Sequence, residues 1–140
     1  MSPSAARAFE ALEPGDEFPV VTIALDKGFV RNHACAIDMN FGRFTDDEAA
    51  RGEGLPGQIT PGNMTLALLA RCLVEWLPGA RLTRLGTTFR GLALTGATVK
   101  VIGTITEKDE AGRSVECDVW MENPEGDRWV IGTATLSFRP

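Results

Sequence analysis

The chain has 140 residues, 44% of them hydrophobic, and a formal net charge of −5 at pH 7. This length fits one domain with a core of ordinary size. The acidic balance argues against a nucleic-acid surface and against binding to an anionic membrane, since both need basic patches. We therefore expect a single domain over residues 1–140, with residues 1–12 as a short extension.

The cysteines and the N-terminus predict the cellular compartment of the protein. Cys35, Cys72 and Cys117 are odd in number and widely separated, which favours reduced thiols over a disulfide framework. The first seven residues lack the apolar core of a signal peptide, so we expect a cytoplasmic protein. One histidine and three isolated cysteines lack the spacing of a metal site, and no glycine loop matches a phosphate or dinucleotide fingerprint. We expect neither a metal nor a bound cofactor.

The first 57 residues predict short elements. Ser4–Leu12 predicts a short helix, and the β-branched run Phe18–Ala24 predicts a strand that Pro19 places near a sheet edge. Asp26 is a candidate N-cap for a helix that reaches about Ile37, with a buried stripe of Phe29, Val30, Ala34 and Ile37. Residues 38–57 are mostly irregular, apart from a possible turn of helix at Asp46–Arg51. Loops of this length are often functional.

A long apolar helix follows. Thr60 is a candidate N-cap, Pro61 would occupy the first helical position, and Pro78-Gly79 would end the helix. Its polar residues are few, and they are Asn63, Thr65, Arg71 and Glu75. A helix that is apolar nearly all round must be buried, so we expect the rest of the protein to wrap it. It is too short and too interrupted by charge for a good membrane span.

The remaining chain predicts strands. Four runs have strand character, and they are Leu82–Arg90, Ala97–Thr106, Ser114–Glu122 and Arg128–Phe138. Turn residues at 109–112 and 123–127 predict that the last three strands form a meander of hairpins. A buried helix beside an antiparallel sheet is an α+β plan in which the sheet curls round the helix. Such a sheet leaves an exposed edge and face, so we expect at least a dimer.

Four local motifs in this order are similar to the MaoC-like enoyl-CoA hydratase branch of the hot-dog fold, over roughly residues 13–138. Residues 36–40 (Ala-Ile-Asp-Met-Asn) resemble the Gly-Asp-x-Asn step that opens the catalytic loop of that family. Residues 59–65 (Ile-Thr-Pro-Gly-Asn-Met-Thr) resemble its Ile-Ala-His-Gly-Met-Leu-Thr entry to the central helix. The other two matches are residues 89–96, which resemble a turn between strands, and residues 123–134, which resemble the final hairpin.

The resemblance implies a hot-dog fold and an enoyl thioester hydratase or dehydratase, a lyase of fatty acid metabolism. The family dyad Asp-x-Asn-Pro-x-His is only partly present, since Asp38 and Asn40 match but Phe41 and Arg43 replace the Pro and the His. Arginine cannot shuttle a proton, because its pKa lies far above working pH. The resemblance therefore implies Asp38 as the acid/base group.

Substrate contacts are expected at two places. The N–H groups of Gly62 and Asn63 at the start of the helix are candidate oxyanion donors, and Pro61 replaces the histidine that commonly precedes this glycine in the family. Asn40 and Arg43 are the other candidate substrate-binding residues. Arg43 equally suits an ion pair with Asp46 or Asp47, and Asp38 equally suits the role of a helix terminator.

Three functions stay open on the sequence. The first is an acyl-CoA or acyl-carrier-protein hydratase with an altered site. The second is a non-catalytic hot-dog subunit that pairs with an active homologue, a role implied by the lost family histidine. The third is a hot-dog thioesterase. His33, the only histidine, is expected to be an ordinary helix residue, Arg71 and Glu75 are expected to form an ion pair, and Trp76, Trp120 and Trp129 are expected to be packing or interface residues.

Overall fold

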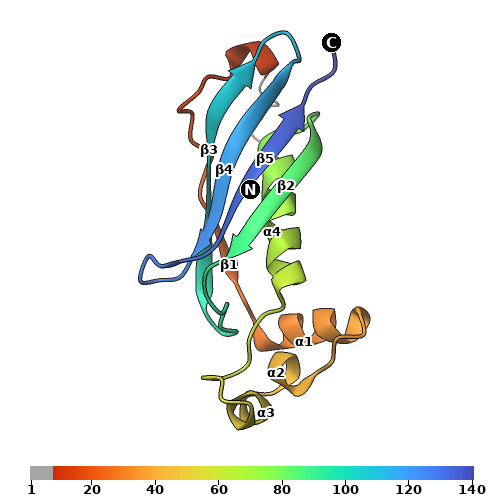
Figure 1. Cartoon of the computed structure of the whole chain (residues 1–140), viewed down its shortest axis with the longest axis vertical. Coiled ribbons are helices and arrows are strands. Elements are labelled where there is room, and N and C mark those ends of the chain that lie inside the picture. The colour runs from red at the N-terminus through yellow and green to blue at the C-terminus, as the bar shows by residue number, and fades with distance from the viewer. Residues whose placement is uncertain (1–7) are drawn as a thin grey trace.

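The computed structural model describes residues 8–140. It contains a five-stranded antiparallel sheet in the order β1-β3-β4-β5-β2, with the long helix α4 along one face (Figure 1). The strands are β1 Val21–Ala24, β2 Arg81–Phe89, β3 Thr98–Asp109, β4 Ser114–Glu122 and β5 Arg128–Ser137. The helices are α1 Lys27–Ala36, α2 Gly42–Thr45, α3 Asp47–Gly52 and α4 Gly62–Trp76. The predicted α+β plan is confirmed.

The sheet is a meander with one displaced strand. β3, β4 and β5 pair as consecutive antiparallel hairpins, as their turn residues predict. β2 does not join this meander in chain order, because it pairs with β5 at the opposite edge from β1. The segment between β2 and β3 carries no tight two-residue turn, so the chain crosses to the other side of the sheet instead of folding straight back.

The N-terminal part is less helical than predicted. The predicted helix Ser4–Leu12 lies partly outside the described residues, and its described part forms only a 3-10 turn at Phe9–Ala11. Phe9 and Leu12 are buried, so this turn closes one end of the core. β1 starts at Val21 instead of Phe18 and lies at a sheet edge, as Pro19 suggests.

Helix α1 has its predicted cap but a narrower buried stripe. The Phe29 N–H donates to Asp26 Oδ1 at 3.1 Å, so Asp26 is the N-cap. Val30 and Ala34 are fully buried, whereas Phe29 is 47% exposed and Ile37 is 39% exposed. The prediction of a wider buried stripe is wrong, because α1 lies at the end of the sheet, beyond the first turn of α4, and does not lie flat on a sheet face (Figure 1).

Helix α4 begins one residue later than predicted. Pro61 is its N-cap, and the Thr60 hydroxyl is paired with the Thr95 hydroxyl at 3.2 Å, so Thr60 does not cap the helix. Only one stripe of α4 is buried by the rest of this chain. The residues of this stripe are Met64, Thr65, Leu69, Cys72, Leu73 and Trp76. Val74 on another side is 42% exposed. The expectation that this chain wraps the whole helix is therefore too strong.

Trp76 anchors the last turn of α4 to the sheet. Its indole stacks on Phe18 with 4.9 Å between ring centroids, and its Nε1–H donates to Pro19 O at 2.9 Å. The ring fills the space above Gly103 of β3, where an added Cβ would stand 2.6 Å from it. The predicted packing role of Trp76 is confirmed.

The cysteines are free thiols, as predicted. Burial raises the pKa of Cys72 to about 11 and that of Cys117 to about 12, so both stay protonated at neutral pH. Cys35 is exposed.

Arg71 and Glu75 form the expected ion pair at 2.9 Å. Over residues 8–140, no helix is long and apolar enough to cross a membrane, and no three His, Cys, Asp or Glu side chains group as metal ligands.

Candidate active site

The N-terminus of α4 carries two available backbone donors. The N–H groups of Met64 and Thr65 bond to Pro61 O, but those of Gly62 and Asn63 have no acceptor among residues 8–140. No side chain caps this helix. Unpaired N–H groups and the helix dipole make such an end favourable for an anionic oxygen.

An aromatic side chain borders these donors. The ring of Phe89, at the end of β2, stands so close to Gly62 that an added Cβ would lie 3.0 Å from Cζ. Phe89 is nevertheless 53% exposed. It therefore forms an apolar wall beside two polar N–H groups, which is the usual composition of a small-molecule site.

His33 reaches this helix end from α1. Its Nε2 lies 3.4 Å from Asn63 Oδ1, and Asn63 Nδ2 lies 3.4 Å from Met39 Sδ. His33 is half-buried. The side chains of His33, Met39 and Asn63 thus meet at the first turn of α4, and His33 is the titratable member of this group.

Asp38 has a clear structural role. It follows α1 in the left-handed conformation, with φ of 60°. The Met39 N–H donates to Ala34 O at 2.8 Å and the Asp38 N–H to Cys35 O at 3.2 Å, which is the bonding of a Schellman helix end. The Asp38 side chain is exposed and contacts no other described residue through a hydrogen bond or ion pair. Asp38 thus terminates α1, one of the two roles foreseen for it.

Arg43 and Asn40 make no side-chain contact with the α4 N-terminus, although Arg43 O accepts from the Ile59 N–H at 2.9 Å. Arg43 Nη2 is 2.8 Å from Glu53 Oε1, so the ion pair foreseen for Arg43 exists but with a different partner from Asp46 or Asp47. Asn40 is exposed. Of the predicted site residues, Pro61, Gly62 and Asn63 come together at the start of α4, whereas no contact joins Asp38, Asn40 or Arg43 to them.

Residues 38–57 are more helical than predicted, since α3 matches the possible turn of helix at Asp46–Arg51 and α2 is an additional helix. Asp46 caps α3 through the Ala49 N–H at 3.0 Å. Gln58 is 2% exposed and ties the helices together: its Nε2 donates to Phe44 O at 2.8 Å, and its N–H donates to Asp47 Oδ1 at 2.9 Å. Lys27 of α1 pairs with the same Asp47 carboxylate. These contacts fix the short helices that precede the start of α4.

Replacing Asp47 with Asn is expected to loosen residues 42–58. The hydrogen bond from Lys27, and then the Gln58 N–H, lowers the pKa of Asp47 below its usual 3.8. A lowered pKa means that the ionised carboxylate stabilises the fold above its unfolded pKa, and that this stabilisation is lost as pH falls through the folded value. Hydrogen exchange of residues 42–58 should therefore accelerate in D47N at neutral pH, and in the wild type below about pH 4.

The matched control for D47N is E48Q. Glu48 is exposed and has no hydrogen-bond or ion-pair partner among residues 8–140. Hydrogen exchange of residues 42–58 in E48Q should equal that in the wild type. Equal protection of residues 42–58 in D47N and E48Q would contradict the anchoring role of Asp47.

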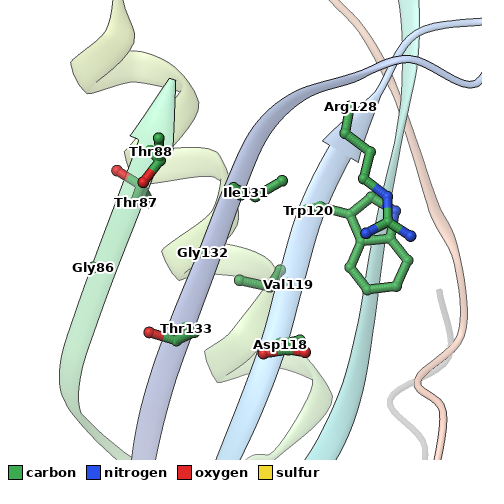
Figure 2. A pocket seen from close by; sticks show the side chains of 10 residues that line it. All are labelled: Gly86, Thr87, Thr88, Asp118, Val119, Trp120, Arg128, Ile131, Gly132 and Thr133. Carbon is green, nitrogen blue, oxygen red and sulfur yellow. The ribbon is translucent and has the colours of Figure 1, made fainter. Parts of the chain in front are cut away.

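A hollow of a different kind lies elsewhere, on the outer face of the sheet (Figure 2). It has a volume of about 420 Å³ and runs over β2, β5 and β4, where Gly86, Thr133 and Asp118 form a row of small side chains. Trp120 and Arg128 border it, with the guanidinium 4.1 Å from the indole centroid. Ile131 and Trp120 alternate along their strands with the buried Val130 and Val119, so this face points away from the core and from α4. The hollow is thus separate from the helix end.

Comparison with known proteins identifies the family. Residues 13–123 match the sequence profile of the MaoC like domain. The chain belongs to the MaoC-like family. A solved MaoC-like dehydratase is 27% identical with a TM-score of 0.87, over 96% of this chain and 43% of that chain. A search of curated protein sequences found no match.

Two further solved structures show the fold. The R-hydratase PhaJ1 from Pseudomonas aeruginosa is 18% identical with a TM-score of 0.85, covering 94% of this chain and 86% of that one. A chain of the ChsH1–ChsH2 complex from Mycobacterium tuberculosis is 21% identical with a TM-score of 0.82, covering 91% of this chain and 98% of that one. The predicted hot-dog fold is confirmed by these MaoC-like likenesses.

His33 is the site residue that the sequence interpretation undervalued. A signal for it was present, because His33 lies three residues after Val30 and one before Ala34, the two buried positions of α1. A side chain at that place on a helix points to the same side as the buried stripe. Its partner, thirty residues further on, is set by the packing of two helices.

Proposed function

We propose that this MaoC-like protein binds an acyl thioester, presented as acyl-CoA or on an acyl carrier protein, and hydrates or dehydrates it. The observation that carries the proposal is the pair of available N–H groups of Gly62 and Asn63 at the α4 N-terminus. Addition of water to an enoyl thioester places negative charge on the thioester oxygen, and two preorganised N–H donors stabilise that charge. The thioester supplies its own carrier, so the proposed reaction needs no bound cofactor.

We also propose that the active form is a homodimer or a complex with another hot-dog subunit. Within residues 8–140, β2 pairs on one side with β5, and its other side has no partner strand. The apolar Val74 on α4 is 42% exposed as well. Pairing through a nine-residue edge strand satisfies its backbone groups and extends the sheet.

A second candidate function is that of a non-catalytic partner subunit. The residue in the place of the family histidine is Arg43, and its guanidinium is held by Glu53. An arginine in an ion pair neither accepts nor delivers a proton at working pH. The similar ChsH1–ChsH2 structure is, by its name, a complex of two different components, which supports this reading for a hot-dog chain.

The deciding experiment is an assay of the purified chain with crotonyl-CoA, alone and with a hot-dog protein that copurifies with it. Loss of the enoyl absorbance by the isolated homodimer supports the hydratase and rules out the partner role. Thiol release with an unchanged enoyl group indicates a thioesterase. Activity that needs the second protein supports the partner role. No turnover in any of these mixtures would contradict the hydratase proposal. Light scattering on the same samples gives the oligomeric state.

A further inference from the structure

We infer that His33 is the proton-transferring residue of this site, in place of Asp38 or Arg43; the inference rests on the proposed function. His33 is the titratable side chain that contacts a residue of the α4 N-terminus, through Asn63 Oδ1 at 3.4 Å. Asp38 ends α1 and faces outward, and Arg43 is paired with Glu53. The proposed chemistry needs one acid/base group near the oxyanion donors, and His33 contacts the side chain of Asn63, whose backbone N–H is one of those donors.

The neighbours of His33 set its tautomer. The Met39 sulfur only accepts a hydrogen bond, so the Asn63 group that faces it at 3.4 Å is the Nδ2 donor. Asn63 therefore presents Oδ1 to His33, and Oδ1 accepts from Nε2–H. The proton of the neutral ring resides on Nε2, and Nδ1 is the free base. Asn63 thus contributes its side chain to the histidine and its backbone N–H to the thioester oxygen.

The hydration step balances with one base. His33 Nδ1 takes a proton from water while the water oxygen bonds to C3 of the enoyl thioester. The π electrons of the C2–C3 double bond move toward the carbonyl, and the resulting enolate oxygen is held by the N–H groups of Gly62 and Asn63. The imidazolium then returns its proton to C2, which gives the 3-hydroxyacyl thioester and restores neutral His33. Dehydration is the same sequence in reverse.

The charged groups around His33 are mostly engaged elsewhere. On its own helix, Lys27 pairs with Asp47, and Arg31 donates from Nε to Thr45 O at 3.0 Å. On the neighbouring short helices, Arg43 is held by Glu53. Asn63 of α4 is neutral, and Asp38, five residues along the chain, is the remaining carboxylate on this segment. Among residues 8–140, no hydrogen bond or ion pair joins any of these charged groups to His33.

The kinetic test compares H33Q with D38N. Glutamine retains an amide donor for Asn63 but cannot transfer a proton, and asparagine tolerates the left-handed conformation of residue 38. With crotonyl-CoA, H33Q should lower kcat by about 100-fold or more with little change in KM, and D38N should stay within about threefold of the wild type. The acid limb of the wild-type kcat–pH profile should disappear in H33Q and persist in D38N.

A second measurement does not depend on turnover. His33 is the only histidine in the chain, so an untagged sample gives a single imidazole in a nitrogen–proton correlation spectrum. The neutral ring should show the Nε2–H tautomer, and M39L, which removes the sulfur acceptor at similar volume, should weaken that preference. An Nδ1–H tautomer in the wild type would overturn the assignment. A wild-type enzyme that is active and whose H33Q variant keeps the same kcat would also overturn the role of His33, while the hydratase proposal would stand. An inactive wild type would instead refute the proposed function itself.

Discussion

Replacing Gly62 with proline should lower kcat for enoyl-CoA hydration by about 100- to 1,000-fold, equivalent to about 2.7–4 kcal/mol of lost transition-state stabilisation. The substitution removes one of the two N–H donors at the start of α4. The backbone is already suited to it, because proline is favoured at the first helical position and Pro61 has the extended conformation required before a proline, with ψ of 141°. Steady-state kinetics with crotonyl-CoA measures the effect.

The control for G62P is G62A, which keeps the N–H. Its Cβ would approach the Phe89 ring at 3.0 Å, but Phe89 is 53% exposed and has room to turn aside. We therefore expect G62A to lose less than about tenfold in kcat. Equal activity of G62P and G62A would show that the Gly62 N–H does not hold the thioester oxygen. Far-ultraviolet circular dichroism of both variants confirms that α4 is intact.

The second large effect concerns stability. Trp76→Ala is expected to cost about 3–5 kcal/mol of unfolding free energy, a large share of the roughly 5–15 kcal/mol of a typical domain. The change empties the space above Gly103, removes the stack on Phe18 and leaves Pro19 O without the indole donor. Urea unfolding followed by circular dichroism, with constant slope, gives the difference.

Trp120→Ala is the matched control for Trp76→Ala. Trp120 is also a tryptophan, but it is half-buried on the outer face, where it contacts Arg128 and donates to Glu122 at 3.2 Å. We expect Trp120→Ala to lower the unfolding free energy by about 1 kcal/mol, in keeping with the loss of an exposed cation–π contact. Comparable losses for the two variants would mean that Trp76 does not anchor α4 to the sheet.

The sequence supports the predictions that rest on local patterns. The last three strands follow from turn residues beside alternating runs, such as Val115, Cys117, Val119 and Met121, all of which are buried. The cap of α1 follows from Asp26, whose side chain needs only the next few residues. The pairing of β2 with β5 could not be predicted in the same way, because no local turn specifies a partner on the far side of a sheet.

The candidate site shows the same division. Gly62 and Asn63 were accessible to sequence reasoning, since a proline and a glycine open an apolar helix. The contact of His33 with Asn63 depends on how α1 and α4 are packed, which neither segment encodes alone. The overestimate of burial on α4 has a related cause. Apolarity shows that Val74 is suited to burial, but it does not tell whether its own chain or another supplies the cover.

The strand order also has a consequence for synthesis on the ribosome. β2 ends at Phe89, about forty residues before its partner β5 begins at Arg128, and β3 and β4 lie between them in the chain. At translation rates of about 5–20 residues per second, β2 emerges several seconds before β5 can pair with it. During that interval both of its edges and its apolar side chains are available to other nascent chains. The β2 edge that β5 covers in the folded domain therefore stays open to other contacts until β5 has been made.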